Sequence, residues 1–105
     1  MLYNNSLISA EPGTYYTRIV SYTERKPANR KPYIEVEMII DNLVVIDRWY
    51  ENRLAYIMNC IRRQFHADYL DYTYSQLLRM AMDNPIMVHL SYHMQYGQQI
   101  DYRAD

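Results

Sequence analysis

The spacing of hydrophobic residues predicts three strands in the first half of the chain. Residues 14–24 are rich in β-branched and aromatic side chains, which is typical of a strand. Between residues 33 and 40 every second side chain is apolar, which predicts a half-buried strand. Its inward residues are Ile34, Val36, Met38 and Ile40. Asp41 and Asn42 tolerate left-handed backbone and predict a turn, so residues 43–50 are expected to return as an antiparallel third strand.

At Glu51 the hydrophobic period changes from that of a strand to that of a helix. The apolar residues expected on one helical face are Leu54, Ile57, Met58, Ile61 and Phe65. A shorter helix is expected to follow an N-cap at Thr73, with Gln76 completing a capping box, and to stop at residues 83–85. Alternation then resumes, and the residues expected to face inward are Ile86, Val88, Leu90, Tyr92 and Met94. A hairpin turn at 95–98 leads to a fifth strand over 99–103.

The order of these elements is three strands, a helical segment and two strands. A five-stranded OB-fold barrel has this order, and so does an α+β sheet covered by a helix pair. We therefore expect a β-rich α+β protein, built as a small five-stranded OB-like barrel or sheet with helices between strands 3 and 4. Residues 14–105 are expected to form a single OB-like domain, preceded by an N-terminal arm over residues 1–13.

The composition excludes several kinds of site. Two glycines are too few for a glycine-rich phosphate loop, and Cys60 alone allows neither an internal disulfide nor a multi-cysteine zinc site. His89 and His93 would lie about 13 Å apart on one strand, at about 3.3 Å per residue, which is too far for one metal ion. No acid and base pair adjoins a nucleophile. We therefore expect no enzyme, no metal and no cofactor.

The same sequence predicts a cytoplasmic protein. The aliphatic runs are far shorter than a membrane span, and the first residues lack the basic and apolar regions of a signal peptide. A lone cysteine fits a reducing compartment. Because free cysteine packs as a small hydrophobic residue, Cys60 is expected to be a buried, unreactive thiol.

Charged and aromatic residues give the candidate binding chemistry. The net charge is only −1, but the loop between the first two strands carries the basic residues Arg25, Lys26, Arg30 and Lys31. Such a cluster can bind backbone phosphates, or it can keep a hairpin tip soluble. Thirteen residues are tyrosine, and exposed rings stack on unpaired bases. The rings expected along an OB-like groove are Tyr33, Trp49, Tyr50 and Tyr96, whereas Glu35 and Glu37 beside Tyr33 would repel phosphate.

Several segments resemble a family of small phage-encoded OB-like domains that are regarded as single-stranded DNA-binding and are encoded near recombination genes. The similar segments lie within residues 12–103: PGTYY at 12–16, KPYIEVEM at 31–38, LAYI at 54–57, PIMVHL at 85–90 and YGQQIDY at 96–102. The short helix before Pro85 is similar too. The resemblance implies an OB-like fold and a role in DNA recombination.

Two functions stay open at this point. The first is a non-enzymatic binder of single-stranded DNA, with the basic loop contacting phosphates and with Tyr33, Trp49 and Tyr96 stacking on bases. The second is a small phage-type inhibitor of a host defence protein, such as a CRISPR effector nuclease (an anti-CRISPR). Balanced charge and abundant tyrosine, a common anchor of protein interfaces, favour the second. A homodimer is a third possibility. Either function places the chain in the cytoplasm of a host cell, with no membrane partner.

Overall fold

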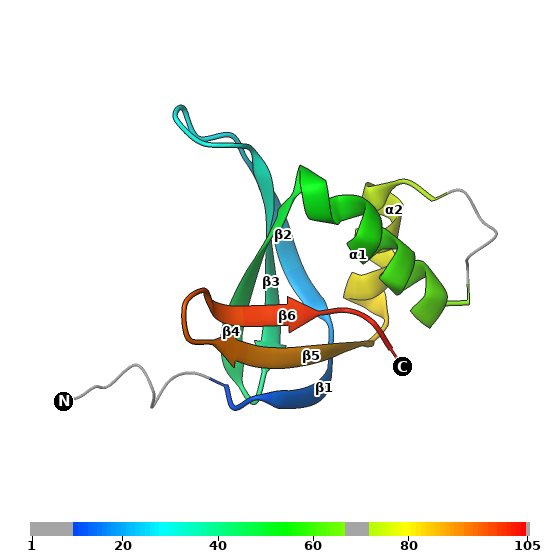
Figure 1. Cartoon of the computed structure of the whole chain (residues 1–105). Helices are drawn as coiled ribbons and strands as arrows, with labels where there is room; N and C mark the ends of the chain where they lie inside the picture. The colour runs from blue at the N-terminus through cyan, green and yellow to red at the C-terminus, as the bar shows by residue number, and fades with distance from the viewer. Residues whose placement is uncertain (1–9, 67–71, 105) are drawn as a thin grey trace.

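The structure, a computed structural model, describes residues 10–66 and 72–104. The described residues form six strands and two helices, shown in Figure 1. The strands are β1 (Gly13–Thr17), β2 (Ile19–Arg25), β3 (Tyr33–Ile40), β4 (Leu43–Tyr50), β5 (Ile86–His93) and β6 (Gly97–Asp101). The helices α1 (Glu51–Gln64) and α2 (Tyr74–Asp83) lie between β4 and β5 in the chain. The prediction of a β-rich α+β protein is confirmed.

The strands form two antiparallel sheets of three, with the orders β1-β5-β6 and β2-β3-β4. The prediction of one continuous strand over residues 14–24 is wrong, because the chain passes from the first sheet to the second at Arg18. The register of β2 against β3 shifts between Ile19 and Ser21, and such a bulge bends a strand. The Thr17 hydroxyl donates to the carbonyl of Ile39 at 2.6 Å and ties β1 to β3.

The hairpin of β3 and β4 follows the predicted pattern. Asp41 and Asn42 have φ values of 52° and 63°, as a two-residue hairpin turn requires. This turn sets the register, which pairs Ile40 with Leu43 and Tyr33 with Tyr50. The four predicted inward residues of β3 are all buried: Ile34, Val36, Met38 and Ile40.

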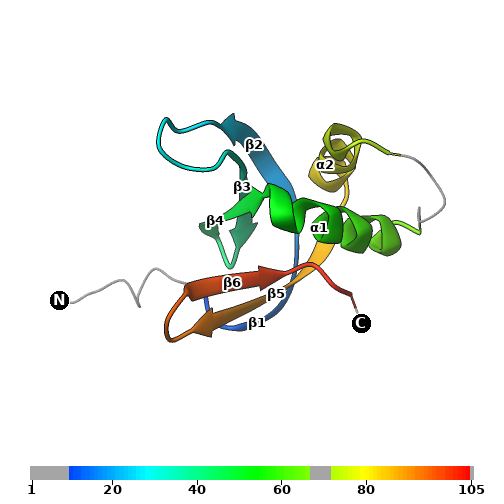
Figure 2. The same ribbon diagram turned by 45° about the horizontal axis from the view of Figure 1, so that its top comes forward.

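Both predicted helices are confirmed. Helix α1 buries Ile57, Cys60 and Ile61 in the core. The capping box of α2 is formed by Thr73 and Gln76, and the helix buries Leu77, Leu78 and Ala81. In Figures 1 and 2 both helices lie on one side of the molecule and the turn between β5 and β6 lies on the other. No helix in the described part of the chain combines the length and the apolar character needed to cross a membrane.

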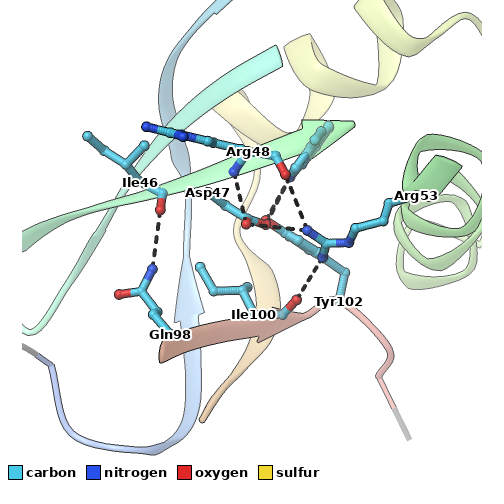
Figure 3. Close-up of polar contacts among 8 residues, drawn as sticks. Ile46, Asp47, Arg48, Arg53, Gln98, Ile100 and Tyr102 are labelled. Atoms are coloured by element: carbon cyan, nitrogen blue, oxygen red, sulfur yellow. Dashed lines mark hydrogen bonds and ion pairs between the residues drawn. The ribbon is translucent and has the colours of Figure 1, made fainter. Parts of the chain in front are cut away.

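Side chains, rather than a backbone ladder, join β4 to β6. Within the described residues the two strands share no ladder, so the sheets do not close into a continuous barrel. Gln98 Nε2 donates to the carbonyl of Ile46 at 3.2 Å (Figure 3). The Arg53 guanidinium donates to the carbonyl of Ile100 at 3.2 Å and to that of Arg48 at 3.3 Å. Residues 46 and 48 thus face 98 and 100, so β4 and β6 run in the same direction.

The carboxylate of Asp47 lies beneath these contacts between β4 and β6. Asp47 Oδ2 accepts hydrogen bonds from the Tyr102 hydroxyl at 2.6 Å and from Trp49 Nε1 at 3.2 Å. Trp49 Nε1 also donates to the Tyr102 hydroxyl at 2.9 Å, and Arg53 lies 3.5 Å from Asp47 Oδ1. Figure 3 shows Asp47, Arg53 and Tyr102 converging between the two sheets.

Two further expectations concern the ends of β5 and the N-terminal arm. The alternating residues of β5 are buried only as far as Leu90, because the hairpin then extends past the core. The prediction that Tyr92 and Met94 face inward is wrong, since they are 41% and 105% exposed.

Of the expected arm over residues 1–13, residues 1–9 lie outside the described residues. Ala10 is buried, its carbonyl accepts a 2.6 Å hydrogen bond from the Tyr92 hydroxyl, and Gly13 begins β1.

Candidate nucleic-acid interface

The face of the β2-β3-β4 sheet that points away from the core carries most of the candidate chemistry, and we call it the outer face. Because side chains alternate along a strand, the register places its residues in rows across the three strands. The first row is Arg25, Tyr33 and Tyr50; the second is Thr23, Glu35 and Arg48; the third is Ser21, Glu37 and Ile46; the last pairs Ile39 with Val44.

An aromatic and cationic cluster occupies one end of the outer face. The rings of Tyr33 and Tyr50 lie 5.2 Å apart between centroids and are tilted by 46°. The Arg48 guanidinium carbon lies 5.0 Å from the centroid of the Tyr33 ring, within cation–π range. A side-chain hydrogen bond with Tyr50, followed by the electrostatic effect of Tyr33, raises the pKa of Arg48. The cluster therefore holds a permanent positive charge against two half-buried rings.

The two glutamates expected to repel phosphate are both engaged with neighbouring strands. Arg25 donates to Glu35 Oε2 at 3.1 Å, and the Glu35 side chain is 19% exposed. Ser21 donates to Glu37 Oε1 at 3.0 Å. Glu35 also stands directly opposite Arg48 in the register. It therefore lies between two arginines, which reduces the repulsion that an isolated carboxylate would exert on a phosphate.

The basic loop adjoins this cluster. Arg25 ends β2, and Lys26, Arg30 and Lys31 are exposed in the loop that precedes Tyr33. A hollow of about 450 Å³ lies at its base, lined by Lys31, Pro32, Tyr50, Glu51 and Asn52. Tyr50 is the N-cap residue of α1 and supplies no side-chain cap, so the amides of the first helical turn lack that partner. The hollow thus combines a cation, an aromatic ring, an amide side chain and the carboxylate of Glu51.

The expectation of an exposed ring at residue 49 is wrong. Trp49 is 2% exposed, and its indole nitrogen is bonded to Asp47 and Tyr102. Its ring packs edge-on against Tyr102, with centroids 5.4 Å apart. The register explains the placement, because residue 49 pairs with the inward residue Ile34. A nucleic-acid base cannot reach Trp49 without disrupting the core.

Tyr96 is exposed, as expected for a hairpin tip, but it is remote from Tyr33. It is 69% exposed, and its ring contacts that of His93, with the centroids 4.8 Å apart and the planes tilted by 31°. Gln98 fixes the start of β6 against Ile46, so the tip lies toward the opposite end of the outer face from Tyr33. Six residues of β3 separate those ends, about 20 Å at roughly 3.3 Å per residue. In Figures 1 and 2 this tip and the β2–β3 loop project on the same side of the molecule.

Arg48 was not among the predicted residues, and Tyr50 was expected along the groove but was not among the predicted binding residues. The signal that could have found them is the alternation itself. A two-residue turn at 41–42 places Tyr33 opposite Tyr50 and Glu35 opposite Arg48, so both side chains must share the face of Tyr33. Of the two neighbouring rings that end this strand, the prediction assigned stacking to Trp49, which faces the core, and not to Tyr50, which lies on the outer face.

Cys60 on α1 and the polar residues Thr14, His89 and His93 of the other sheet lie outside the outer face. Cys60 is buried, as predicted, and burial raises the pKa of its thiol. The Thr14 hydroxyl lies 2.8 Å from His89 Nδ1, and His93 Nδ1 accepts from the amides of Gln95 and Tyr96 at 3.0 and 3.3 Å. Among the residues that the structure describes, no group of three or more His, Cys, Asp or Glu side chains lies close enough to hold a metal ion.

The sequence matches no protein-family model and no curated protein.

Proposed function

We propose that the chain is a non-enzymatic module with an OB-like fold that binds single-stranded DNA on the outer face of its β2-β3-β4 sheet. The topology supports the interpretation of the fold as OB-like, because β1 and β2 together correspond to one bent strand shared by both sheets. The remaining order is β3, β4, two helices, β5 and β6, and the hydrogen bonds of Gln98 and Arg53 join β4 to β6. The resemblance to phage-encoded domains supports a phage or mobile-element setting and a role in DNA recombination.

The observation that carries the proposal is the meeting of the basic loop with the cluster of Tyr33, Tyr50 and Arg48. Rings and guanidinium planes stack on bases of any sequence, and lysine and arginine side chains neutralise phosphates. Lys31 and Tyr50 line one hollow, so a nucleotide bound there would contact both kinds of group. In this proposal the binding residues are Tyr33, Tyr50 and Arg48, together with the loop residues Arg25, Lys26, Arg30 and Lys31.

Fluorescence anisotropy with an end-labelled dT oligonucleotide tests the proposal. We expect binding at low salt, with a logarithmic affinity that falls linearly as the logarithm of the salt concentration rises. Single-stranded ligands give a slope of about −0.7 per neutralised charge, so contacts to three or four basic residues predict a slope of about −2 to −3. Absence of binding at low salt would contradict the proposal.

Matched variants locate the interface. Lys31→Glu should weaken binding several-fold, whereas Arg79→Glu, the same charge reversal on the exposed side of α2, should have little effect at moderate salt. Tyr33→Leu should also weaken binding, because aliphatic side chains do not stack on a base as a ring does. Tyr16→Leu is its control, since Tyr16 is 71% exposed on the other sheet. Equal effects of test and control variants would place the binding surface elsewhere.

One observation favours the alternative, an inhibitor of a host defence protein. The far end of the outer face carries exposed aliphatic side chains: Ile39 at 47%, Val44 at 65% and Ile46 at 45%. Contiguous exposed aliphatic residues are typical of protein-binding surfaces. If Val44→Asp with Ile46→Asp abolishes the activity of the chain in a phage infection assay while oligonucleotide binding is unchanged, the protein-binding function is the better account.

A further inference from the structure

The second row of the outer face places a hydrogen-bond acceptor beside a donor. Glu35 and Arg48 are directly paired across β3 and β4. Opposed residues of antiparallel strands have Cβ atoms about 4.5–5.5 Å apart, so the two functional groups can contact one planar ligand. Arg25 holds Glu35 from the other side at 3.1 Å. The carboxylate is therefore fixed in place and keeps free lone pairs, because an ionised carboxylate has about four acceptor sites.

The first row supplies the surface on which such a ligand would lie. A base stacked on Tyr33 or Tyr50 directs one edge toward the second row, since rows along a strand are about 6.6 Å apart. Arg48 already lies over the Tyr33 ring, 5.0 Å from its centroid. When a base stacks on that face of Tyr33, the guanidinium has to move off the ring, and the edge of the base then lies within its reach.

The donor and acceptor pattern of this row matches one base. Guanine presents two adjacent donors, N1–H and the N2 amine, which a carboxylate accepts together, and two acceptors, O6 and N7, which a guanidinium binds in bidentate fashion. Its O6 and N1 are neighbours, as Glu35 and Arg48 are. Adenine turns the N1 acceptor toward the carboxylate, and thymine and cytosine each offer it a single donor position.

We infer that the outer face is selective for guanine within single-stranded DNA, with Glu35 reading the N1 and N2 donors and Arg48 reading O6 and N7. Arg25 is a positioning residue that orients Glu35. This inference rests on the proposed function and deepens it, because it assigns a role to a carboxylate that would otherwise oppose DNA binding.

The test uses hexanucleotides of dT that carry one central dG, deoxyinosine or 7-deaza-dG, with binding measured by anisotropy. Deoxyinosine lacks only the N2 amine and 7-deaza-dG only the N7 acceptor, so stacking is nearly constant across the series. We expect the dG oligonucleotide to bind about tenfold more tightly than the deoxyinosine one, as for loss of one good base contact. Glu35→Gln should abolish that difference, and Glu37→Gln, one row away, should preserve it.

The outcomes separate the two proposals. If no oligonucleotide binds, the proposed function is overturned together with this inference. If all of them bind the unaltered protein equally, selectivity is overturned and single-stranded DNA binding stands. The comparison of ligands on the unaltered protein needs no variant, so it decides the question even where Glu35→Gln fails to fold. A loss of selectivity in Glu37→Gln as large as in Glu35→Gln would overturn the assignment to Glu35.

Discussion

Removal of the Tyr102 hydroxyl tests whether side chains hold the two sheets together. In Tyr102→Phe the buried ring and its edge-on contact with Trp49 are kept. The hydroxyl that donates to Asp47 at 2.6 Å and accepts from Trp49 at 2.9 Å is lost. A hydrogen bond to a charged group contributes about 1.5–3 kcal/mol, and a neutral one about 0.5–1.5 kcal/mol. Trp49 keeps Asp47 as a second acceptor at 3.2 Å, so we take the low end of the range for its lost hydrogen bond to the Tyr102 hydroxyl.

We therefore expect Tyr102→Phe to lower the free energy of unfolding by about 2–3 kcal/mol. For a domain near 100 residues this corresponds to a decrease in Tm of about 10 °C or more. Urea unfolding followed by circular dichroism measures the first quantity, and a thermal scan measures the second. Tyr16→Phe is the matched control, because Tyr16 is exposed and should change stability by less than about 0.5 kcal/mol. A loss within that range for Tyr102→Phe would refute the reasoning.

The same pair has a pH signature. Burial, followed by the charge of Asp47, raises the pKa of Tyr102 well above its usual value. A raised tyrosine pKa in the folded state stabilises the protein below the unfolded pKa of about 10 and loses that contribution as the pH rises further. The difference in stability between the unaltered protein and Tyr102→Phe should therefore shrink above pH 10. A constant difference from pH 7 to 11 would show that the hydroxyl does not titrate as the structure requires.

Three further results are expected. Cys60 should react slowly with a thiol reagent in the folded protein and fast in urea, because it is buried and its pKa is raised by desolvation; equal rates would contradict its burial. Thr73→Ala should cost about 1 kcal/mol in urea unfolding by removing the capping box of α2, while Arg79→Ala, in the exposed middle of that helix, should cost much less. A hydrogen bond to Asp101 raises the pKa of Tyr56 to about 12, so Asp101→Asn should move one late-ionising tyrosine toward pH 10 in an ultraviolet titration; an unchanged titration would refute the assignment.

Elements set by local patterns were predictable from the sequence. The hairpin of β3 and β4 follows from alternation and a turn at 41–42, and α2 follows from the Thr73–Gln76 cap and the residues before Pro85. The outer face was equally within reach, since the register of one hairpin assigns Tyr50 and Arg48 to it. The selection of Trp49 failed because ring type was weighed ahead of strand parity.

The contacts that join the two sheets were beyond such patterns. Trp49 and Asp47 meet Tyr102 across 53 and 55 residues, and no periodicity links positions so far apart. The split of residues 14–24 into β1 and β2 has the same origin. The composition of residues 14–24 favours extended backbone throughout. Only the pairing of β1 with β5 and of β2 with β3 decides where the chain passes from one sheet to the other.

The side-chain contacts between β4 and β6 also affect how the β2-β3-β4 sheet would bind a ligand. An open strand edge invites pairing with another chain, because its amides and carbonyls lack partners. Along β4 the carbonyls of Ile46 and Arg48 already accept bonds from Gln98 and Arg53. Helix α2 packs beside β2 at the other edge, where the Tyr74 hydroxyl donates to Glu24 at 3.1 Å. With carbonyls of the β4 edge bonded and α2 packed beside β2, the side chains of the outer face offer a ligand more than the strand edges do, and this favours recognition through stacking and side-chain hydrogen bonds over strand addition.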